Sequence, residues 1–480
     1  LDNAWELIAA GHGAAAAWGA AMERVARQIA ALGDQYLRAR AVDVRGVGDQ
    51  VLRELLGIDA ARVTGKGILV VAELDPAQSA RLDAETVRGI VLAGGSPTSH
   101  AAILARSKGI PMVTGAGLDV LAHPEGTMAA LDGTAGVLAV APDAETLAAF
   151  KAKVKARRKA LRRAAKAAQS PARMAESGPV IAVMGNIGSV ADAVRAARAG
   201  ADGFGLVRTE FLFDSAETAP PREEQEAVYR AIAEAAGGHK VVFRTLDAGG
   251  DKPLKFAPLA REANPFLGVR GIRLSLAYPE LLTDQLMALA AVARDHEVGI
   301  MFPMVSSIAE LRQARILVAR AAFRQGGSLP AGLQIGIMIE VPSAALKAAA
   351  FAPMVDFFSV GTNDLTQYAL AADRGNPALA GLADGLDPGV LALIKALTRS
   401  ARGQASVSVC GELASDPAAV PVLLGLGVRS LSVAVPAVPE VKEAVRSLSK
   451  RAARALARRA LACPDAAAVR ELVAAPRFED

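Results

Sequence analysis

The chain has 480 residues, which at about 150 per domain predicts roughly three domains. Hydrophobic residues make up 52% and charged residues 21%, a composition that excludes disordered and fibrous proteins. The net charge of +5 comes from residues 151–173, which hold ten basic residues and no acidic one. Because the remainder has 44 basic against 49 acidic residues, the overall charge does not support a nucleic-acid partner.

Cysteine content and hydropathy indicate the cellular compartment in which the protein works. The two cysteines, Cys410 and Cys463, cannot build a disulfide framework, which fits a reducing cytosol. The apolar segment Ala14–Ala21 has no basic residue before it, so it makes a poor signal peptide, and no other apolar run reaches about 18 residues. We therefore expect a soluble cytoplasmic protein without membrane insertion. Since the chain starts at Leu1 and not at Met, we also expect that an upstream part has been removed.

The first half of the chain predicts a helical part followed by a small α/β domain. Residues 1–58 have apolar positions three and four apart, and Gly57 closes the last helix. Residues 59–145 change to short β-like runs with one helical stretch, Thr98–Ser107. The runs are Gly67–Val71, Gly89–Leu92, Pro111–Val113, Thr127–Leu131 and Gly136–Val140.

The sequence of residues 144–170 predicts a basic helix that serves as a linker, and we place the limits of this linker at 146–175. It has an apolar stripe along one face and solvated charges elsewhere. A polyanion-binding helix is the alternative, but it would need aromatic residues or a recognisable module, and the segment has neither. We therefore favour a connecting helix.

Residues 176–480 predict a (β/α)₈ barrel. Eight candidate strands alternate with helical sequence over about 300 residues. An open doubly wound sheet is the alternative, but no glycine-rich dinucleotide fingerprint follows any of the strands. The strands are Val180–Met184, Gly203–Val207, Val241–Arg244, Gly299–Met304, Gln334–Ile339, Asp356–Val360, Ser406–Val409 and Arg429–Val433.

Reactive or polar side chains follow six of the eight predicted strands, where the loops of a barrel build its active site. Arg208, Arg244 and Arg270 offer planar forks for phosphate and carboxylate oxygens. Glu340 and Asp364 are two carboxylates on neighbouring strands, a number that suits Mg²⁺. Several cations and one metal ion at the same edge indicate a small anionic substrate and phosphoryl transfer. The alternative is that these residues form only scattered ion pairs on the surface. The segments are Arg208-Thr209-Glu210, Arg244-Thr245-Leu246-Asp247, Phe302-Pro303-Met304, Glu340, Gly361-Thr362-Asn363-Asp364 and Cys410-Gly411-Glu412.

Cys410 and His100 are candidate catalytic residues. Cys410, at a strand end beside the predicted metal site, is either an acid and base for a substrate carbon or a buried small hydrophobe. His100 lies in the first turn of a helix for which Thr98 or Ser99 is the natural N-cap. The helix dipole disfavours imidazolium there and would stabilise a phosphoryl group on the ring nitrogen, although a lone histidine at a helix start is often only a surface residue.

These segments resemble a known family. Gly94-Gly95-Ser96-Pro97-Thr98-Ser99-His100 and the residues up to Ser107 resemble the phosphohistidine swivelling domain of phosphoenolpyruvate-utilising enzymes. The segments 208–213, 247–252, 264–270, 361–368, 373–376 and 410–414 are similar to enzyme I of the sugar phosphotransferase system. The match covers residues 30–470 approximately, which is nearly the whole chain.

The resemblance implies that phosphoenolpyruvate and a protein histidine give pyruvate and phosphohistidine. His100 would take the phosphoryl group and pass it to the carrier protein HPr, with Cys410 protonating the enolate carbon. Glu340 and Asp364 would hold Mg²⁺, and Arg106 would steady the phosphorylated imidazole together with Thr98. The family dimerises through the barrel, so a homodimer is expected. The residues implied for binding phosphoenolpyruvate are Arg208, Arg244, Arg270, Asn363 and Arg374.

Three departures from the family pattern bear on these expectations. The first departure is that residues 1–58 correspond only to a remnant of the helical HPr-binding domain. Within this remnant, Asp34–Arg45 matches the last helices of the domain. Ser96-Pro97 lengthens the turn before Thr98 by one residue, a form similar to fused multiphosphoryl transfer proteins, and Ala93 stands where an acidic residue is common.

Two other functions are alternatives. Pyruvate, phosphate dikinase and phosphoenolpyruvate synthase share the swivelling domain and the barrel but need an upstream nucleotide-binding domain, and the forms of segments 208–213 and 373–376 favour enzyme I. A regulatory module that senses phosphoenolpyruvate without turnover is disfavoured, because every chemical residue is intact.

Overall fold

The structure is a computed structural model that divides into two compact units, Leu1–Val154 with Gly375–Ala380, and Lys155–Arg374 with Gly381–Asp480. The residues it describes are 2–31, 44–46, 48, 51–52, 55–56, 66–74, 78, 82–83, 85–94, 105, 108–133, 135–213, 216–250, 254–260, 262–373, 376, 379 and 381–475.

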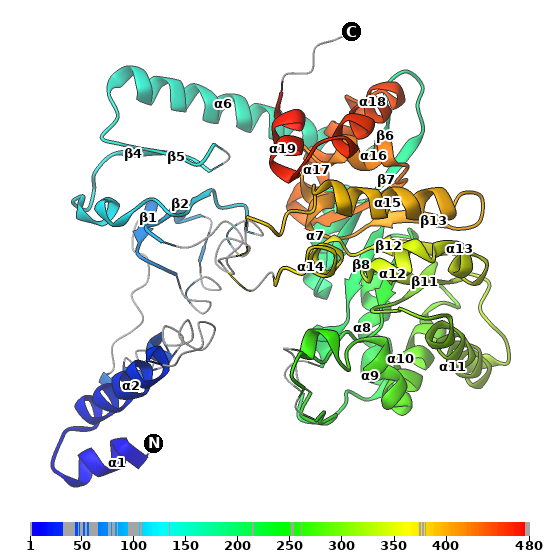
Figure 1. Ribbon diagram of the computed structural model, residues 1–480, viewed down its shortest axis with the longest axis horizontal. Helices are drawn as coiled ribbons and strands as arrows, with labels where there is room; N and C mark the ends of the chain where they lie inside the picture. Colours follow the sequence, from blue (N-terminus) through cyan, green and yellow to red (C-terminus); the bar gives the residue numbers. More distant parts are fainter. Residues whose placement is uncertain are drawn as a thin grey trace. The chain divides into compact units, whose positions relative to one another are not determined.

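The first unit contains two N-terminal helices and two small sheets (Figure 1). A parallel sheet has the order β1-β2-β3, and β4 pairs antiparallel with β5. All five predicted β-like runs are therefore strands. Gly57 and nearly all of the helix predicted at Thr98–Ser107 lie outside the described residues. The elements are α1 (Asp2–Ala9), α2 (Ala14–Ala30), β1 (Gly67–Val71), β2 (Val87–Leu92), β3 (Met112–Val113), η1 (Leu118–Ala122), β4 (Ala129–Asp132) and β5 (Val137–Val140).

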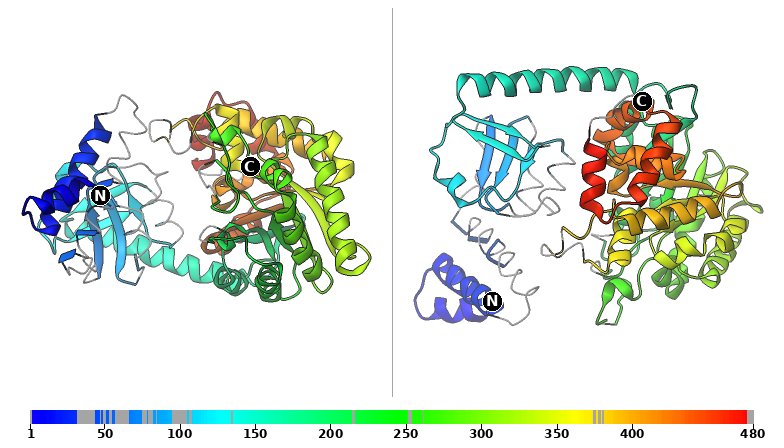
Figure 2. Two further views of the ribbon diagram at one scale, coloured as in Figure 1. Left: turned by 90° about the horizontal axis from the view of Figure 1, so that it is seen from below. Right: turned by 45° about the horizontal axis from the view of Figure 1, so that its top comes forward.

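The predicted basic helix forms as α6 (Ala144–Ala167), drawn as one continuous ribbon in Figure 2. Its C-terminal carbonyls, which have no partner within the helix, are bound by two cations of α17 (Val438–Arg446). The buried Lys442 Nζ donates to Ala168 O at 2.8 Å, and Arg446 Nη2 donates to Ala167 O at 2.8 Å. Two arginines of α6 also form ion pairs with glutamates of α17. These contacts fix the C-terminal part of α6 to the barrel unit, and the connecting role of the helix stays a prediction.

The second unit is a closed barrel of eight parallel strands, as the sequence predicts (Figure 1). Each strand pairs with its successor in the chain, and β14 closes the ring by pairing with β7. The short strand β6 (Ala172–Arg173) pairs antiparallel with β7 and was not predicted. The barrel strands are β7 (Val180–Ile187), β8 (Phe204–Arg208), β9 (Val241–Arg244), β10 (Val298–Phe302), β11 (Leu333–Ile339), β12 (Phe357–Val360), β13 (Ser406–Val409) and β14 (Ser430–Ala434).

Helices cover the outside of the barrel (Figure 2). α11 begins with a capping box, in which Ser307 accepts from the Glu310 N–H and Glu310 bonds back to the Ser307 backbone. The helices are α7 (Val190–Arg198), α8 (Arg222–Ala235), α9 (Ile272–Ala277), α10 (Pro279–Val292), α11 (Ile308–Gly326), α12 (Pro342–Leu346), α13 (Ala348–Phe351), α14 (Thr362–Leu370), α15 (Pro388–Ser400), α16 (Val420–Leu426), α17, α18 (Lys450–Leu461) and α19 (Ala466–Ala474). Short 3₁₀ turns are η2 (Glu210–Leu212), η3 (Pro265–Leu267), η4 (Ala352–Met354), η6 (Glu412–Ser415) and η7 (Val435–Ala437).

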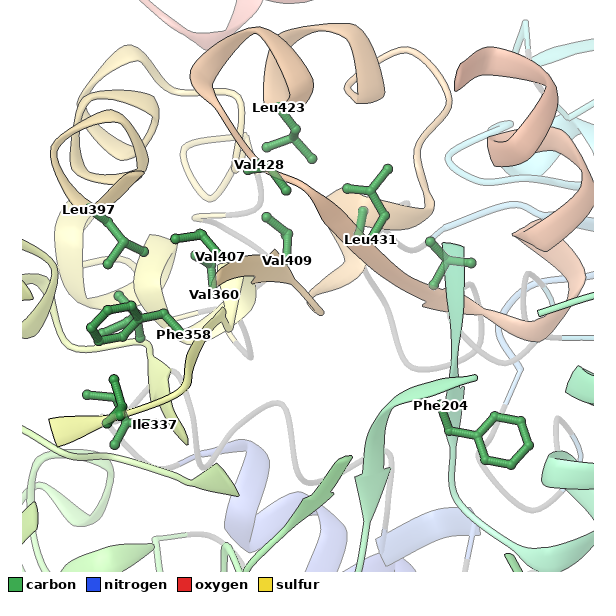
Figure 3. Packing of buried hydrophobic residues seen from close by; sticks show 14 of the residues in the cluster. Phe204, Ile337, Phe358, Val360, Leu397, Val407, Val409, Leu423, Val428 and Leu431 are labelled. Carbon is green, nitrogen blue, oxygen red and sulfur yellow. The ribbon is translucent and has the colours of Figure 1, made fainter. Parts of the chain in front are cut away.

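The side chains of each strand alternate between the helix layer and the barrel interior. Outward residues such as Phe358 and Val407 pack with helix residues such as Leu397, in the cluster drawn in Figure 3. The interior holds a separate buried cluster of Leu206, Val242, Met301, Met338, Phe357 and Cys410. This cluster fills the barrel below the ends of the strands, so that the polar residues that follow form the next layer.

Within the described residues, none of the helices has the length and apolar character needed to cross a bilayer.

Candidate active site

Three charged residues occupy the next inward position above the interior cluster. Arg208, Arg244 and Glu340 each come two residues after an interior residue of the same strand, and alternate residues of a strand face the same side. Arg208 and Arg244 are also direct partners in the register of β8 and β9. The strand pattern therefore brings the predicted substrate cations and one predicted metal ligand to the carboxyl end of the barrel.

Arg244 lies between two buried carboxylates. Its Nη2 is 3.1 Å from Glu210 Oε2, and its Nη1 is 2.9 Å from Asp247 Oδ2. Burial alone lowers the pKa of Arg244, but the negative charges of Glu210, Asp247 and Glu340 outweigh it and raise the pKa above its usual value. The guanidinium group is thus permanently charged. Its Nε has no partner among the described residues, so one donor stays available.

Arg270 continues the same row of charges. Its Nε and Nη2 each lie 3.0 Å from one oxygen of Asp247, a bidentate pair, and its Nη1 donates to Asp364 Oδ1 at 3.1 Å. Asp247 therefore joins both arginines. Gly249 permits this loop to lie against Arg270, because its φ is 101° and a Cβ there would be 2.3 Å from Val269 O.

Together these side chains form an alternating row, Glu210, Arg244, Asp247, Arg270 and Asp364, which we call the charge row. Its members come from the ends of β8 and β9, the segment before α9, and α14. None of these side chains is more than 11% exposed. Charges buried this far need partners, and here each carboxylate faces at least one guanidinium group.

Glu340 is buried completely beside the charge row. Its Oε1 accepts from Met304 N at 2.5 Å, while its Oε2 has no hydrogen-bond partner among the described residues. Burial, together with the negative charges of Asp247 and Asp364, raises the pKa of Glu340 to about 8. Met304 has a φ of 58°, an uncommon conformation for a bulky residue, and β10 ends at Phe302, two residues earlier than predicted. The turn after β10 thus directs one amide at this carboxylate.

The ends of β12 and β13 meet through Asn363. Its Nδ2 donates to Glu412 Oε1 and its Oδ1 accepts from Glu412 N, both at 3.0 Å. Gly411 permits the two loops to approach, because a Cβ there would lie 1.9 Å from Thr362 Oγ1. Asn363 is only partly buried, so the structure places it at the mouth of the barrel with its amide oriented by a neighbouring loop.

Cys410 closes the interior cluster from above. Its Sγ donates to Val360 O at 3.5 Å, and burial raises the pKa of the thiol to about 11. The group is therefore a protonated thiol at neutral pH. Asn186 Nδ2 donates to Cys410 O at 3.1 Å. Both interpretations of this cysteine, a proton donor and a small buried hydrophobe, fit this position.

The two cysteines should differ in reactivity. Iodoacetamide is expected to alkylate Cys410 at least about tenfold more slowly than the half-buried Cys463 in the folded protein at neutral pH, since the thiolate is the reactive form. A time course of peptide masses measures both rates in one sample. The same measurement in denaturant is the control, in which both thiols should react alike. Equal rates in the folded protein would contradict the burial of Cys410.

Four predicted site residues cannot be placed. His100, Thr98, Arg106 and Arg374 lie outside the described residues. The structure brings together the others, which are Arg208, Arg244, Arg270, Glu340, Asn363, Asp364 and Cys410, on the strand ends and loops of one barrel edge.

Four polar residues at this edge were not predicted as site residues. Glu210 and Asp247 belong to segments that the sequence analysis singled out, but their pairing with arginines depends on loop conformation. Asn186 was missed because β7 runs three residues further than predicted, to Ile187. Tyr368, whose hydroxyl donates to Phe266 O at 2.6 Å, follows Asp364 by one helical turn on α14, and that spacing was an available signal.

Two family models match the chain. A PEP-utilising enzyme, PEP-binding domain, matches residues 162–450, and a PEP-utilising enzyme, mobile domain, matches residues 63–136. PEP is phosphoenolpyruvate. The first match covers the described barrel, and the second covers the β1-β2-β3 sheet and β4 but ends before β5.

Among curated proteins, the chain is similar to multiphosphoryl transfer proteins and to phosphoenolpyruvate-protein phosphotransferases. It is 43% identical to the multiphosphoryl transfer protein of Rhodobacter capsulatus over 98% of this chain and 57% of that protein. It is 42% identical to that of Xanthomonas campestris over 99% and 57%. It therefore spans little more than half the length of these two relatives. It is 37% identical to the phosphoenolpyruvate-protein phosphotransferase of Haemophilus influenzae over 94% and 80%. With both family models matched in order and this last relative covered over four fifths of its length, the chain belongs to the enzyme I family of phosphoenolpyruvate-utilising proteins.

Proposed function

We propose that this chain transfers the phosphoryl group of phosphoenolpyruvate to His100 and from there to a histidine of the carrier protein HPr, the first step of the sugar phosphotransferase system. The observation that carries the proposal is the charge row at the carboxyl end of the barrel, with the unpartnered Oε2 of Glu340 beside it. The similarity to phosphoenolpyruvate-protein phosphotransferases supports the same activity.

Phosphoenolpyruvate carries a carboxylate and a phosphate on a small planar skeleton, so it needs several directed cationic donors. Arginine forks match both groups. In the proposal Arg208, Arg244 and Arg270 bind the substrate with Arg374, and Asn363 donates its amide. The carboxylates of the charge row hold two of these guanidinium groups in place before substrate arrives, which reduces the reorganisation that binding requires.

The described residues fit a Mg²⁺ ion. A buried carboxylate whose Oε2 lacks a partner, with Asp364 charged beside it, is a donor set that a hard divalent cation would complete. Glu340 and Asp364 would hold the ion. Among the described residues, no cluster of three or more His, Cys, Asp or Glu side chains could bind a metal, so oxygens of substrate or water would have to complete the shell. When bound, the ion supplies neutralisation of the charge on the transferring phosphoryl group.

The chain supplies a nucleophile and an acid for the two bond changes. A nitrogen of the neutral His100 imidazole attacks phosphorus, the bond between phosphorus and the enol oxygen breaks, and pyruvate enolate is left. The Cys410 thiol gives its proton to the methylene carbon of the enolate, forming pyruvate, and the thiolate recovers a proton from water. The raised pKa of about 11 keeps Cys410 protonated until the enolate forms. Arg106 and Thr98 steady the phosphorylated imidazole.

The proposal assigns a part of the reaction to each region. Residues 59–145 carry His100 as a swivelling domain, the barrel at 176–480 binds phosphoenolpyruvate and Mg²⁺, and 1–58 is a remnant of the HPr-binding domain. The linker at 146–175 connects the two regions that carry the reaction. The swivelling domain moves by changes near 58–63 and within 142–175. A cytoplasmic homodimer that assembles through the barrel completes the proposal.

Incubation with phosphoenolpyruvate and Mg²⁺ tests the activity without any other component. We expect one acid-labile phosphate per chain on His100, located by mass spectrometry, with an equal amount of pyruvate released. The reaction should need no ATP, which separates it from the dikinase and the synthase. The control is His100→Ala, which should remain unlabelled. Labelling of another residue, or labelling that requires ATP, would contradict the proposal.

A further inference from the structure

A buried polar network lies on the outer side of the strands that carry Arg208 and Arg244. Its centre is Gln285, which is 1% exposed and faces the barrel from α10 among leucines, alanines and a valine. Thr209, Tyr229 and Gln225 complete the network and are each at most 2% exposed. Polar groups that are buried this deeply need hydrogen-bond partners. Packing alone does not require a polar residue at position 285, because an apolar side chain could fill the same space.

The donors and acceptors of this network are fixed by backbone groups at its ends. Leu246 N can only donate, so the group that accepts from it at 3.0 Å is Gln285 Oε1. Arg244 O can only accept, so Thr209 Oγ1 donates to it at 2.9 Å. The hydroxyl of Thr209 must then accept from Gln285 Nε2, which is 3.1 Å away.

The second hydrogen of Gln285 Nε2 is also used. It is donated to Tyr229 OH at 3.0 Å, which donates in turn to Gln225 Oε1 at 3.2 Å. Gln225 Nε2 ends the chain on Pro220 O at 2.9 Å. Gln285 therefore uses both donors and its acceptor, and no other arrangement of its amide satisfies the same partners.

We infer that Gln285 is a positioning residue, which sets the spacing of the substrate cations Arg208 and Arg244; this rests on the proposed function. Through Thr209 and Leu246 it binds the residue directly after Arg208 and the second residue after Arg244. Since Arg208 and Arg244 are partners in the strand register, a single amide holds the backbone behind both guanidinium groups.

The network is also connected to the charge row through the backbone. Glu210, which follows Thr209, accepts from Asp247 N at 2.9 Å, and Asp247 is the residue after Leu246. Loss of Gln285 would release both of these backbone segments. Because phosphoryl transfer depends on placing several charges at once, a small displacement here weakens both binding and turnover.

Calorimetric titration of Mg²⁺-loaded protein with phosphoenolpyruvate tests this role. Gln285→Met, which keeps the volume but removes every hydrogen bond, is expected to weaken binding about tenfold and to lower kcat/KM about a hundredfold. The matched control is Tyr229→Phe. It breaks the hydrogen bonds of Tyr229 with Gln285 and Gln225 but keeps those that Gln285 makes with Thr209 and Leu246, so we expect binding within about twofold of the original chain.

The outcomes separate the inference from the proposed function. Thermal melting gives the loss of stability in both variants, and a purely structural Gln285 would weaken binding no more than Tyr229→Phe does. If Gln285→Met does not fold, Thr209→Val removes the hydroxyl that joins Gln285 to Arg244 O and should give the same loss of affinity. Unchanged binding in the folded variant overturns the inference and leaves the proposed function intact. If the unsubstituted chain fails to bind phosphoenolpyruvate, the proposed function fails, and the inference with it.

Discussion

Replacing Arg244 with methionine is expected to lower kcat/KM for pyruvate formation by about 10²–10³-fold, because the side chain supplies a preorganised charge where we propose that the substrate binds. The same change leaves Glu210 and Asp247 without the cation between them. Breaking a buried ion pair on one side costs about 3–5 kcal/mol of unfolding free energy, so the variant should also melt at a lower temperature. Denaturant unfolding and a coupled assay for pyruvate measure the two effects.

A double variant separates folding from function. Arg244→Met with Glu210→Gln removes the carboxylate charge that loses its Arg244 partner, while Asp247 keeps its pair with Arg270, so the double variant should recover part of the stability but none of the activity. The matched control is Arg195→Ala, in an exposed ion pair with Asp192, which should change stability by less than about 1 kcal/mol and leave kcat/KM within twofold. Recovery of activity in the double variant would show that Arg244 acts only through folding.

Glu340→Gln is expected to abolish the response of the protein to Mg²⁺. In the unsubstituted chain, Mg²⁺ should raise the melting temperature by binding the folded state, and pyruvate formation should require it. Glutamine can still accept from Met304 N, but it offers no negative charge to the ion. We expect turnover to fall on the order of 10²–10³-fold at any Mg²⁺ concentration, while stability without Mg²⁺ at neutral pH changes little, since a pKa of about 8 already leaves most of Glu340 uncharged, as glutamine is.

An acid outside the predicted metal site provides the comparison for this variant. Glu412 is exposed and bonds Asn363 at the same mouth of the barrel. Glu412→Gln should therefore keep the Mg²⁺-dependent rise in melting temperature. If Glu340→Gln keeps it as well, Glu340 is not a ligand and the metal site is wrongly placed.

The strand order and the layer of site residues could be predicted because both depend on local pattern. Each barrel strand is a short apolar run with polar residues directly after it, and in a parallel barrel all of these ends lie at one edge. The positions of Arg208, Arg244 and Glu340 follow from that rule and from the alternation of side chains. The rule needs no knowledge of how the loops fold.

The partners of these residues could not be predicted, because they come from segments with no periodic pattern. Asp247 binds Arg270 across a loop of more than 20 residues, whose course depends on Gly249. Gln285 resembles any polar residue of a helix until its bonds to Thr209 and Leu246, which follow β8 and β9, are seen. Met304 reaches Glu340 through a left-handed turn that no neighbouring glycine announces in the sequence.

The clamp on the last carbonyls of α6 has a consequence for the movement that we propose for the swivelling domain. Lys442 and Arg446 tie the end of that helix to the barrel, so a change in the torsion angles there would break hydrogen bonds of a buried ammonium group and of a guanidinium group. We therefore expect the movement proposed for 142–175 to take place upstream of the clamp, near its first residues, where Ala141 immediately before this segment has a φ of 45°. In the proposed movement α6 would then stay with the barrel as a stiff arm, and its length would set how far from the clamp the pivot lies.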